Sequence, residues 1–282
     1  MLFEEIKKNV KQALAEDIGT GDLTALLVPE QQMLMAEIVT REDAVLCGAQ
    51  WFELCFQSVS PDVRIQWFAH DGERLAAQQT ICRITGNARS LLTAERSALN
   101  FLQLLSAVAT QTRRYVDAIA DTQAVIVDTR KTLPGLRLAQ KYAVKCGGGE
   151  NHRLGLYDGV LIKENHIAAA GGIARVLEKA RAIVPRDVFI QIEVESLEEL
   201  QTALDAGATM VLLDNFTQDQ LNEAVALRSS HAKKTGQRIV LEASGNVRFG
   251  TVRSIAETGV DRISIGSLTK NVQAIDLSMR FA

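Results

Sequence analysis

The sequence predicts an α/β protein in which a small α+β domain precedes a parallel sheet or barrel. Two patterns lead to this prediction. Up to about residue 110, helical and strand-like stretches are separated by glycine-containing turns, which is typical of a small domain with antiparallel strands. From Ala124 onward, short apolar segments alternate with amphipathic ones, and the apolar segments end 21 to 35 residues apart. That spacing is typical of repeated strand–helix units.

The first domain, residues 1–110, is predicted to contain a helix followed by three strands. The helix covers residues 3–15, and the strands cover residues 33–39, 63–68 and 80–84. A second helix runs from Ser90 to about Ile119, because apolar residues recur there at helical spacing. This long helix joins the two domains.

The second domain, residues 111–267, is predicted to contain six strands. They end near Asp128, Lys163, Glu193, Asp214, Glu242 and Ile265. Helix start signals follow at Ser196 and Thr217, and glycines suited to helix ends follow at Gly207 and Gly259. A polar or charged residue lies at or just after every strand end. In a barrel and in an open parallel sheet these ends meet at one edge, where active sites lie.

Cations and glycines are concentrated between Asp128 and Lys163. The group comprises Arg130, Lys131, Arg137, Lys141, the run Gly147–Gly149, His152, Arg153 and Lys163. Cations gathered in a folded core repel each other and lose hydration, so the group indicates a pocket for anionic small molecules. The alternatives are a salt-bridged surface loop for Arg130 and Lys131, a flexible loop for the glycines, and a structural role for His152.

Lys163, Glu193 and Asp214 are candidate catalytic residues because each ends a predicted strand. Lys163 either binds an anion or forms a Schiff base. Glu193 and Asp214 are hard oxygen ligands suited to Mg²⁺ that carries a phosphorylated substrate, with salt bridges or helix caps as the alternative. Glu195 replaces Glu193 as the candidate if the strand ends later, since both lie on the same side of it.

Two later segments are candidate phosphate sites. Each follows a predicted strand and leads into a helix, where backbone N–H groups and hydroxyls can bind phosphate oxygens. The residues are Ser244, Gly245 and Asn246 in the first segment, and Gly266 and Ser267 in the second.

Composition excludes several classes of protein. With 31 Lys and Arg against 34 Asp and Glu, the formal charge is −3, which disfavours nucleic acid as a partner. No apolar run approaches the roughly 18 residues that span a bilayer, and the start has no apolar signal region. The four cysteines show no C-x-x-C pair or metal-ligand spacing, so we expect reduced thiols and a soluble, cytoplasmic protein without a membrane partner.

At this point a family resemblance is evident. Residues 128–137, 147–153 and 161–167 resemble the quinolinate phosphoribosyltransferase family. The likeness extends through residues 16–24, 95–100, 213–216, 241–245 and 266–269, and so covers essentially the whole chain. Glu164 stands where the family often has Asp, and Leu133 where it often has Thr. Neither departure affects a charged ligand position.

The resemblance implies an incomplete α/β barrel with an N-terminal α+β sandwich domain, on which the tail from about residue 268 to 282 packs. It also implies a homodimer with shared active sites, into which Arg96 reaches from the partner subunit. Whether dimers assemble further is left open.

The resemblance also implies roles for single residues. The quinolinate carboxylates would be held by Arg130, His152, Arg153 and Lys163. The phosphoribosyl pyrophosphate would lie near Lys131, and its Mg²⁺ and ribose side would be held by Glu193 and Asp214. Its 5-phosphate would be held by Ser244, Gly245, Gly266 and Ser267. Lys131, Lys163, Glu193 and Asp214 form the expected catalytic set. The implied reaction is that of a pentosyltransferase in NAD biosynthesis, which joins the two substrates, releases CO₂ and pyrophosphate, and yields nicotinate mononucleotide.

Three alternatives remain. A related group linked to molybdenum transport shares the run at residues 128–132, but residues 151–153 and 163–166 fit the quinolinate enzymes better. A barrel lyase could use Lys163 in a Schiff base. A metabolite sensor without activity should have lost a Mg²⁺ ligand, whereas Glu193 and Asp214 are both present.

Overall fold

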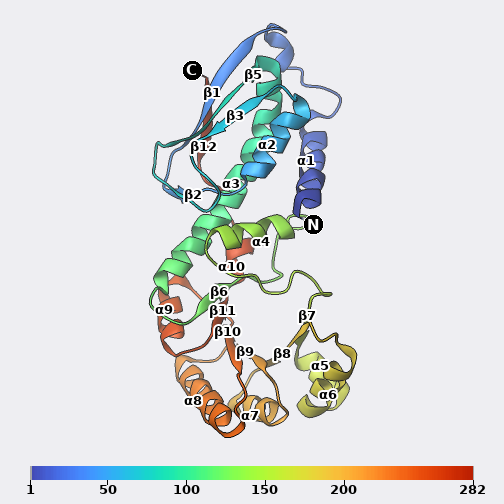
Figure 1. Cartoon of the computed structure of the whole chain (residues 1–282), viewed down its shortest axis with the longest axis vertical. Coiled ribbons are helices and arrows are strands. Elements are labelled where there is room, and N and C mark those ends of the chain that lie inside the picture. The colour runs from blue at the N-terminus through green and yellow to red at the C-terminus, as the bar shows by residue number, and fades with distance from the viewer. Residues whose placement is uncertain (1, 282) are drawn as a thin grey trace. The chain divides into compact units, whose positions relative to one another are not determined.

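The computed structural model describes residues 2–281, which form two compact units (Figure 1). The first unit contains residues up to Arg113, Lys131–Gly148 and residues from Ser267 onward. The second contains Arg114–Arg130 and Gly149–Gly266. The predicted boundary between residues 110 and 111 stays a prediction. Among the described residues, no helix combines the length and the apolar composition that spanning a bilayer requires.

The first unit is built on an antiparallel sheet of four strands in the order β12-β1-β5-β3. The chain therefore returns near its C-terminus to pair β12 with β1, in register from Ala36 opposite Phe281 to Thr40 opposite Leu277. Two further strands pair as a small separate sheet. The strands are β1 (Met33–Thr40), β2 (Ala44–Val45), β3 (Arg64–Trp67), β4 (Arg74–Leu75), β5 (Thr80–Asn87) and β12 (Leu277–Phe281).

Helices accompany this sheet, as the amphipathic patterns predict. The long helix α3 places Leu91, Leu99 and Leu102 in the core at helical spacing. Helix α2 begins after Gly48, and the Asp71 carboxylate accepts hydrogen bonds from the backbone N–H groups of Gly48 and Ala49, which suits the positive end of a helix. The helices are α1 (Leu2–Ile18), α2 (Ala49–Val59), α3 (Ala88–Ala118), α4 (Arg137–Cys146) and α10 (Ser267–Lys270), with a 3-10 turn at Ala25–Leu27.

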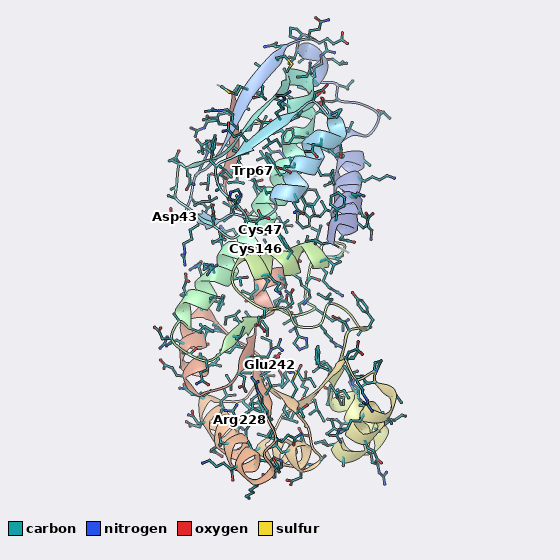
Figure 2. The ribbon with its side chains drawn as sticks, viewed as in Figure 1. Asp43, Cys47, Trp67, Cys146, Arg228 and Glu242 are labelled. Carbon is teal, nitrogen blue, oxygen red and sulfur yellow. The ribbon has the colours of Figure 1, made fainter. Side chains whose placement is uncertain are left out.

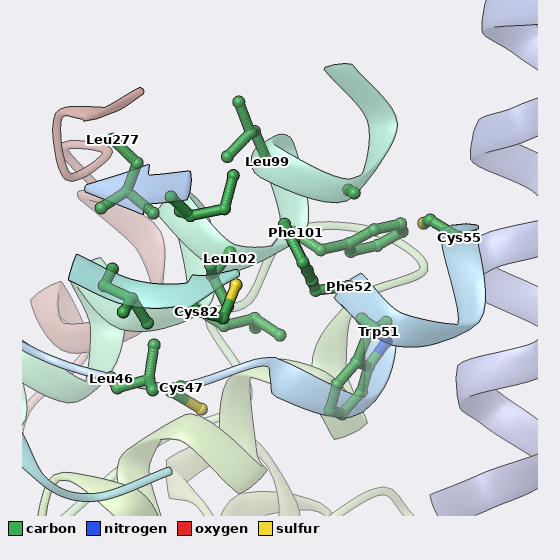
Figure 3. Close-up of a cluster of buried hydrophobic side chains, with 14 of the residues drawn as sticks. Leu46, Cys47, Trp51, Phe52, Cys55, Cys82, Leu99, Phe101, Leu102 and Leu277 are labelled. Carbon is green, nitrogen blue, oxygen red and sulfur yellow. The ribbon is translucent and has the colours of Figure 1, made fainter. Parts of the chain in front are cut away.

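Aromatic side chains fill the core of the first unit (Figure 3). Trp51, Phe52 and Phe56 are fully buried. The rings of Phe52 and Phe56 lie 4.9 Å apart, and Trp51 Nε1 donates to Asn9 Oδ1 at 3.2 Å, so the one polar atom of this indole is satisfied. This core fixes α1 and α2 against the sheet.

The second unit is a parallel sheet of six strands in the order β6-β11-β10-β9-β8-β7. Strands β6 and β7 form its two edges, so the sheet is not closed among the described residues, and the predicted α/β class with an incomplete barrel is confirmed. The strands are β6 (Val125–Val127), β7 (Gly159–Ile162), β8 (Phe189–Val194), β9 (Met210–Asp214), β10 (Val240–Ser244) and β11 (Arg262–Ser264). The helices between them are α5 (Glu164–Ala170), α6 (Ile173–Ile183), α7 (Leu197–Asp205), α8 (Gln218–Thr235) and α9 (Phe249–Glu257).

The run Gly147–Gly149 has a packing reason that the sequence did not reveal. A Cβ on Gly147 would lie 2.5 Å from the backbone oxygen of Ala109 and 2.6 Å from Cβ of Thr112. Gly147 therefore lets the end of α4 lie directly against α3. The close neighbour of Gly147 is thus a helix, and neither the predicted anion pocket nor a flexible loop explains this glycine.

Candidate active site

Strand register brings the predicted site residues onto one face of the parallel sheet. Glu193 pairs with Leu212, Leu212 with Glu242, and Glu242 with Arg262. Lys163 follows directly on the pair of Ile162 with Ile192, so it lies at the level of Glu193. Side chains at one level of a parallel sheet point to the same face, so these residues form one row.

A second row lies two residues further toward the carboxyl ends, on the same face. Asp214 pairs with Ser244, and each lies two positions beyond a residue of the first row. The fallback residue Glu195 lies two positions beyond Glu193, and it is exposed. The predicted convergence of Lys163, Glu193, Asp214 and Ser244 at the carboxyl edge therefore follows from the pairing.

Lys163 and Glu193 form an ion pair. Lys163 Nζ lies 2.9 Å from each Glu193 carboxylate oxygen. The Glu193 side chain is 9% exposed and that of Lys163 is 44% exposed, so the pair lies at the border between core and solvent. A lysine amine engaged in an ion pair suits the binding of an anion better than the formation of a Schiff base, which needs the free amine.

Arg130 and Arg153 lie close enough to repel each other. Burial, and then the positive charge of Arg130, lower the pKa of Arg153, while Asp158 opposes the shift. Arg153 donates from Nη1 to the backbone oxygen of Gly159 at 3.1 Å. Arg130 Nε is buried and has no hydrogen-bond partner among the described residues. A buried donor without a partner beside a second guanidinium indicates a place for an anion.

His152 is positioned by buried polar groups. Its Nδ1 accepts a hydrogen bond from the backbone N–H of Arg153 at 2.7 Å, which assigns the proton to Nε2. Nε2 then donates to Gln191 Oε1 at 2.7 Å, and Glu242 Oε1 lies 3.6 Å away. Both ring nitrogens thus have partners within the protein, so a ligand carboxylate at His152 must replace one of them.

Asp128 organises the loop that carries His152. This carboxylate is fully buried, and it accepts hydrogen bonds from Asn151 Nδ2 at 2.6 Å and from the backbone N–H of His152 at 2.9 Å. Glu150 also forms an isolated bridge with Val127. The loop after α4 is therefore fastened to the carboxyl end of β6, where Arg130 follows.

The predicted phosphate turn after β10 is tightly constrained. Gly245 has φ +95°, and a Cβ there would lie 2.2 Å from Asn215 Oδ1 and 2.8 Å from the Asn215 backbone nitrogen. Asn246 donates from Nδ2 to Asn215 Oδ1 at 3.2 Å. Only glycine fits this position, which leads toward α9.

Three predicted site residues belong to the first unit. Arg96 is exposed on α3, Lys131 is exposed at the start of the segment that contains α4, and Ser267 begins α10 directly after Gly266. The segment of Lys131 is fixed within this unit, because the Thr269 hydroxyl donates to the Lys131 carbonyl at 2.8 Å. Lys141 is 1% exposed, so it is a buried residue of α4.

Gln140, Gln191 and Glu242 are polar residues near the candidate site that the sequence patterns did not single out as site residues. Gln140 Oε1 accepts from the Leu133 backbone N–H at 2.8 Å, and its Nε2 donates to the Thr269 carbonyl at 2.7 Å, so it fixes the loop after Lys131. Gln191 Nε2 donates to Glu242 Oε2 at 3.2 Å. Glu242 is fully buried in the second unit (Figure 2). The available signal was a glutamine in the middle of an apolar strand, two residues before Glu193.

The donor set near Glu193 fits a hard divalent cation. Beside this residue lies a cavity of about 230 Å³ lined by Glu164, Glu193, Glu195 and Glu199 together with Ile167 and Ala168. Asp214 is on the same sheet face, although it does not line this cavity. Mg²⁺ needs only one or two protein carboxylates when substrate phosphates supply further ligands. Because Lys163 engages both Glu193 oxygens, a cation there must share them or displace the lysine.

The fold and the site define a class of protein: an α/β protein with cationic side chains gathered near the carboxyl edge of a parallel sheet. The model of the quinolinate phosphoribosyl transferase N-terminal domain matches residues 22–106, and that of the C-terminal domain matches residues 108–280. The chain therefore belongs to the quinolinate phosphoribosyltransferase family.

Individual relatives align with this chain over nearly their full length. A Mycobacterium leprae protein named nicotinate-nucleotide pyrophosphorylase [carboxylating] is 40% identical over 98% of this chain and 97% of its own. A Bacillus subtilis protein, which carries the same name with the qualifier "probable", is 41% identical over 98% of this chain and 93% of its own. The structure of the nicotinate-nucleotide pyrophosphorylase from Francisella tularensis superposes with a TM-score of 0.94 at 43% identity, covering 99% of this chain and 96% of that one.

Proposed function

We propose that the chain transfers the phosphoribosyl group of phosphoribosyl pyrophosphate to quinolinate, with loss of CO₂, to form nicotinate mononucleotide in NAD biosynthesis. One observation supports this function most strongly: within residues 2–281, the buried Arg130 Nε has no hydrogen-bond partner, and it lies near Arg153, whose pKa is lowered. Quinolinate carries two adjacent carboxylates, and an anion between two guanidinium groups relieves their repulsion. We choose quinolinate as the substrate because the family to which the chain belongs is named after it.

In the proposed complex, Arg130 and Arg153 bind the quinolinate carboxylates, and Lys163 adds a positive charge at the end of β7. His152 completes the site if Nε2 exchanges Gln191 for a carboxylate. Two unit charges about 4 Å apart interact by roughly 4 kcal/mol at an effective dielectric of 20. A few such contacts fix the pyridine ring and direct its nitrogen toward the ribose.

The second substrate is proposed to occupy the neighbouring part of the carboxyl edge. The 5-phosphate binds at Ser244, Gly245 and Asn246, with Gly266 and Ser267 following β11, and Lys131 contributes charge to the pyrophosphate. Glu193 and Asp214 would hold Mg²⁺ together with substrate oxygens. When bound, Mg²⁺ takes up charge on the departing pyrophosphate.

The chain's own residues act mainly by positioning. As the bond from ribose C1 to pyrophosphate breaks, C1 becomes electron-poor. The ring nitrogen of quinolinate, whose carboxylates the arginines bind, then forms the new bond to C1. Carboxylates at Glu193 and Asp214 stabilise the positive charge that develops on the sugar. The ring of the product is cationic, so it accepts the electron pair when the carboxylate at C2 leaves as CO₂.

The active site is proposed to be shared within a homodimer. Arg96 is exposed in the first unit, where it is free to contribute to the site of a partner subunit. A cytoplasmic location, and the absence of nucleic-acid and membrane partners, stay predictions from composition.

A direct assay tests the proposed function. The protein is incubated with quinolinate, phosphoribosyl pyrophosphate and Mg²⁺, and CO₂ and the mononucleotide are measured together. We expect equal amounts of both products, no turnover with excess EDTA, and recovery on adding Mg²⁺. Absence of both products, under conditions in which the Mycobacterium leprae relative is active, would contradict the proposal.

A Schiff-base lyase that uses Lys163 is tested in parallel. Borohydride is added with a carbonyl substrate, and the intact mass is measured. We expect no adduct, because the Lys163 amine is engaged in an ion pair with Glu193. A covalent adduct at Lys163 would favour the lyase.

A further inference from the structure

The four cysteines of the first unit fall into two kinds. Cys55 and Cys82 are buried in the core, where burial raises the pKa of Cys55 to about 12, and burial and the charge of Glu53 raise the pKa of Cys82. Cys47 and Cys146 instead lie together (Figure 2). Their Sγ atoms and a carboxylate oxygen of Asp71 all lie within 4.8 Å of one another.

The backbones of this cysteine pair are both held against α3. The Cys47 backbone N–H donates to Ser106 Oγ at 3.0 Å, and the Ser106 hydroxyl donates to the Cys47 carbonyl at 3.2 Å. Cys146 ends α4, and the next residue, Gly147, packs against Ala109 and Thr112 of α3. The two sulfur atoms are therefore brought together by packing rather than by a mobile segment.

The two thiols differ in access. Cys47 is fully buried and lies at the margin of the core cluster (Figure 3). Cys146 is only partly buried, so it is the more accessible residue of the two. A reactive cysteine that is accessible and lies next to a second, protected cysteine is the arrangement of redox-sensitive pairs.

The surroundings also favour a thiolate on Cys146 rather than on Cys47. Hydrogen bonding by Cys47, and then by Tyr142, lowers the pKa of Cys146, although burial and the charge of Asp71 oppose the shift. Burial is the first cause that raises the pKa of Cys47 well above its usual value. Since the thiolate is the nucleophile, these opposite directions favour Cys146 over Cys47 as the thiol that attacks first.

We propose that Cys146 and Cys47 are an oxidisable pair that closes to a disulfide when the protein meets a hydroperoxide. The Cys146 thiolate attacks one peroxide oxygen, the O–O bond breaks, and the sulfenic acid forms with release of hydroxide. The Cys47 sulfur then attacks the sulfenic sulfur, the S–O bond breaks, and water leaves with the Cys47 proton. Two thiols are oxidised and one H₂O₂ is reduced to two water molecules.

The movement that this step requires is small. The sulfur atoms start no more than 4.8 Å apart and must reach about 2.05 Å. The proposal requires that rotation of the two side chains about their Cα–Cβ bonds, with a shift at the end of α4, covers this distance. The disulfide would then join the end of α4 to the residues before α2.

Peptide mapping of the full-length protein tests the pair without any assay of turnover. The reduced protein is treated with a stoichiometric series of H₂O₂, remaining thiols are alkylated under denaturing conditions, and the unreduced digest is analysed by mass spectrometry. We expect one linked pair of peptides, containing Cys47 and Cys146, with Cys55 and Cys82 alkylated. A link to Cys55 or Cys82, a link between two chains, or four alkylated cysteines after complete consumption of peroxide would overturn the proposal.

Variants separate the two roles. In Cys47→Ser, we expect Cys146 to accumulate as a sulfenic acid that dimedone traps, whereas Cys146→Ser should leave Cys47 unreacted. Cys55→Ser is the matched control and should form the link as the unaltered chain does. Reaction of Cys47 in Cys146→Ser to the same extent as Cys146 in Cys47→Ser would contradict the proposed order. If a variant fails to fold, the peptide mapping of the unaltered chain still tests the pair.

The same atoms suggest a soft metal ion as the competing occupant, because Asp71 adds an oxygen to two sulfurs. The zinc content of the purified protein is therefore measured before oxidation. We expect substoichiometric zinc and an unchanged yield of the link after treatment with a chelator. One tightly bound zinc per chain that prevents the link would overturn the proposal.

Discussion

Arg130 and Lys163 illustrate two ways in which the protein holds a positive charge at one site. Lys163 already has an anionic partner in Glu193, whereas Arg130 Nε is buried without one. The first arrangement pairs a lysine with a carboxylate of the protein, and the second leaves a donor that an anion can satisfy. A ligand with two carboxylates can therefore meet Arg130 and Arg153 while it competes with Glu193 for Lys163.

Replacing Lys163 with alanine should affect binding far more than folding. The lysine side chain is 44% exposed, so its ion pair contributes at most about 1 kcal/mol to stability. Loss of one charged contact to quinolinate should lower kcat/KM by about tenfold or more. Steady-state kinetics and thermal unfolding measure the two effects. Lys234→Ala, at an exposed lysine of α8, is the control, and a large loss of stability in Lys163→Ala alone would contradict this prediction.

Gln191 should act as a positioning residue for His152. Gln191→Leu removes the side-chain amide that hydrogen-bonds His152 Nε2 and Glu242 Oε2, and a buried unsatisfied polar group costs about 1–3 kcal/mol. We expect a lower melting temperature and a raised KM for quinolinate, with little change in the KM for phosphoribosyl pyrophosphate. Gln201→Leu, on the exposed face of α7, should change neither constant. Equal changes in both constants of Gln191→Leu would indicate a merely structural role.

The residue types of the site could be predicted from the sequence because each follows an apolar segment. The buried hydrogen-bond network of Gln191, Glu242 and His152 could not be predicted from the sequence, because the partners of each side chain depend on the order of the strands in the sheet. In the same way, Cys47 and Cys146 are 99 positions apart, and only the packing of β2, α2 and α4 against α3 brings their sulfur atoms together.

At the scale of elements, strand register is what assembles the carboxyl edge. The predicted strand ends lie within two residues of the observed ones: β6 ends at Val127, β9 at Asp214 and β10 at Ser244. The position of a strand end can be predicted from the sequence alone, because an apolar run is followed there by a charged or polar residue. Strands β2 and β4 are only two residues long, so no alternating pattern could reveal them. The order of the strands was equally hidden, because β6 pairs with β11 across more than 130 residues.

Contact between α4 and α3 should depend on the absence of a side chain at Gly147. Gly147→Ala places a methyl group against the backbone oxygen of Ala109, and overpacking of this kind costs about 1–3 kcal/mol. Gly250→Ala in α9 is the matched control, because its Cβ meets nothing within 4 Å and alanine favours a helix by about 0.5–1 kcal/mol. Chemical denaturation should therefore show opposite signs for the two variants. Equal stability of both would refute the packing account.

At the scale of the whole molecule, the central question is whether one chain builds a complete site. The second unit carries Arg130, Arg153, Lys163, Glu193 and Asp214, whereas Arg96 and Lys131 belong to the first unit. Lys131 follows Arg130 directly in the chain, so its contribution needs no second subunit. Arg96 is exposed on α3 of the first unit, and the role we propose for it depends on the proposed dimer.

Mixed dimers test the shared site. Arg96→Ala and Lys163→Ala chains, each nearly inactive alone, should recover about half of the native activity in verified heterodimers, because one site of a two-fold dimer then has both residues. Activity is measured on heterodimers isolated with two different affinity tags. Heterodimers of Lys163→Ala with Arg96→Ala that stay inactive would show that Arg96 acts within its own chain or not at all.

The crystal structure of the complex with quinolinate is the most direct test of the anion site. We predict that the two carboxylates of the ligand contact Arg130, Arg153 and Lys163 at the carboxyl edge of the parallel sheet, with Arg130 Nε hydrogen-bonded. Quinolinate bound at another surface, with Arg130 Nε still lacking a partner, would contradict the account.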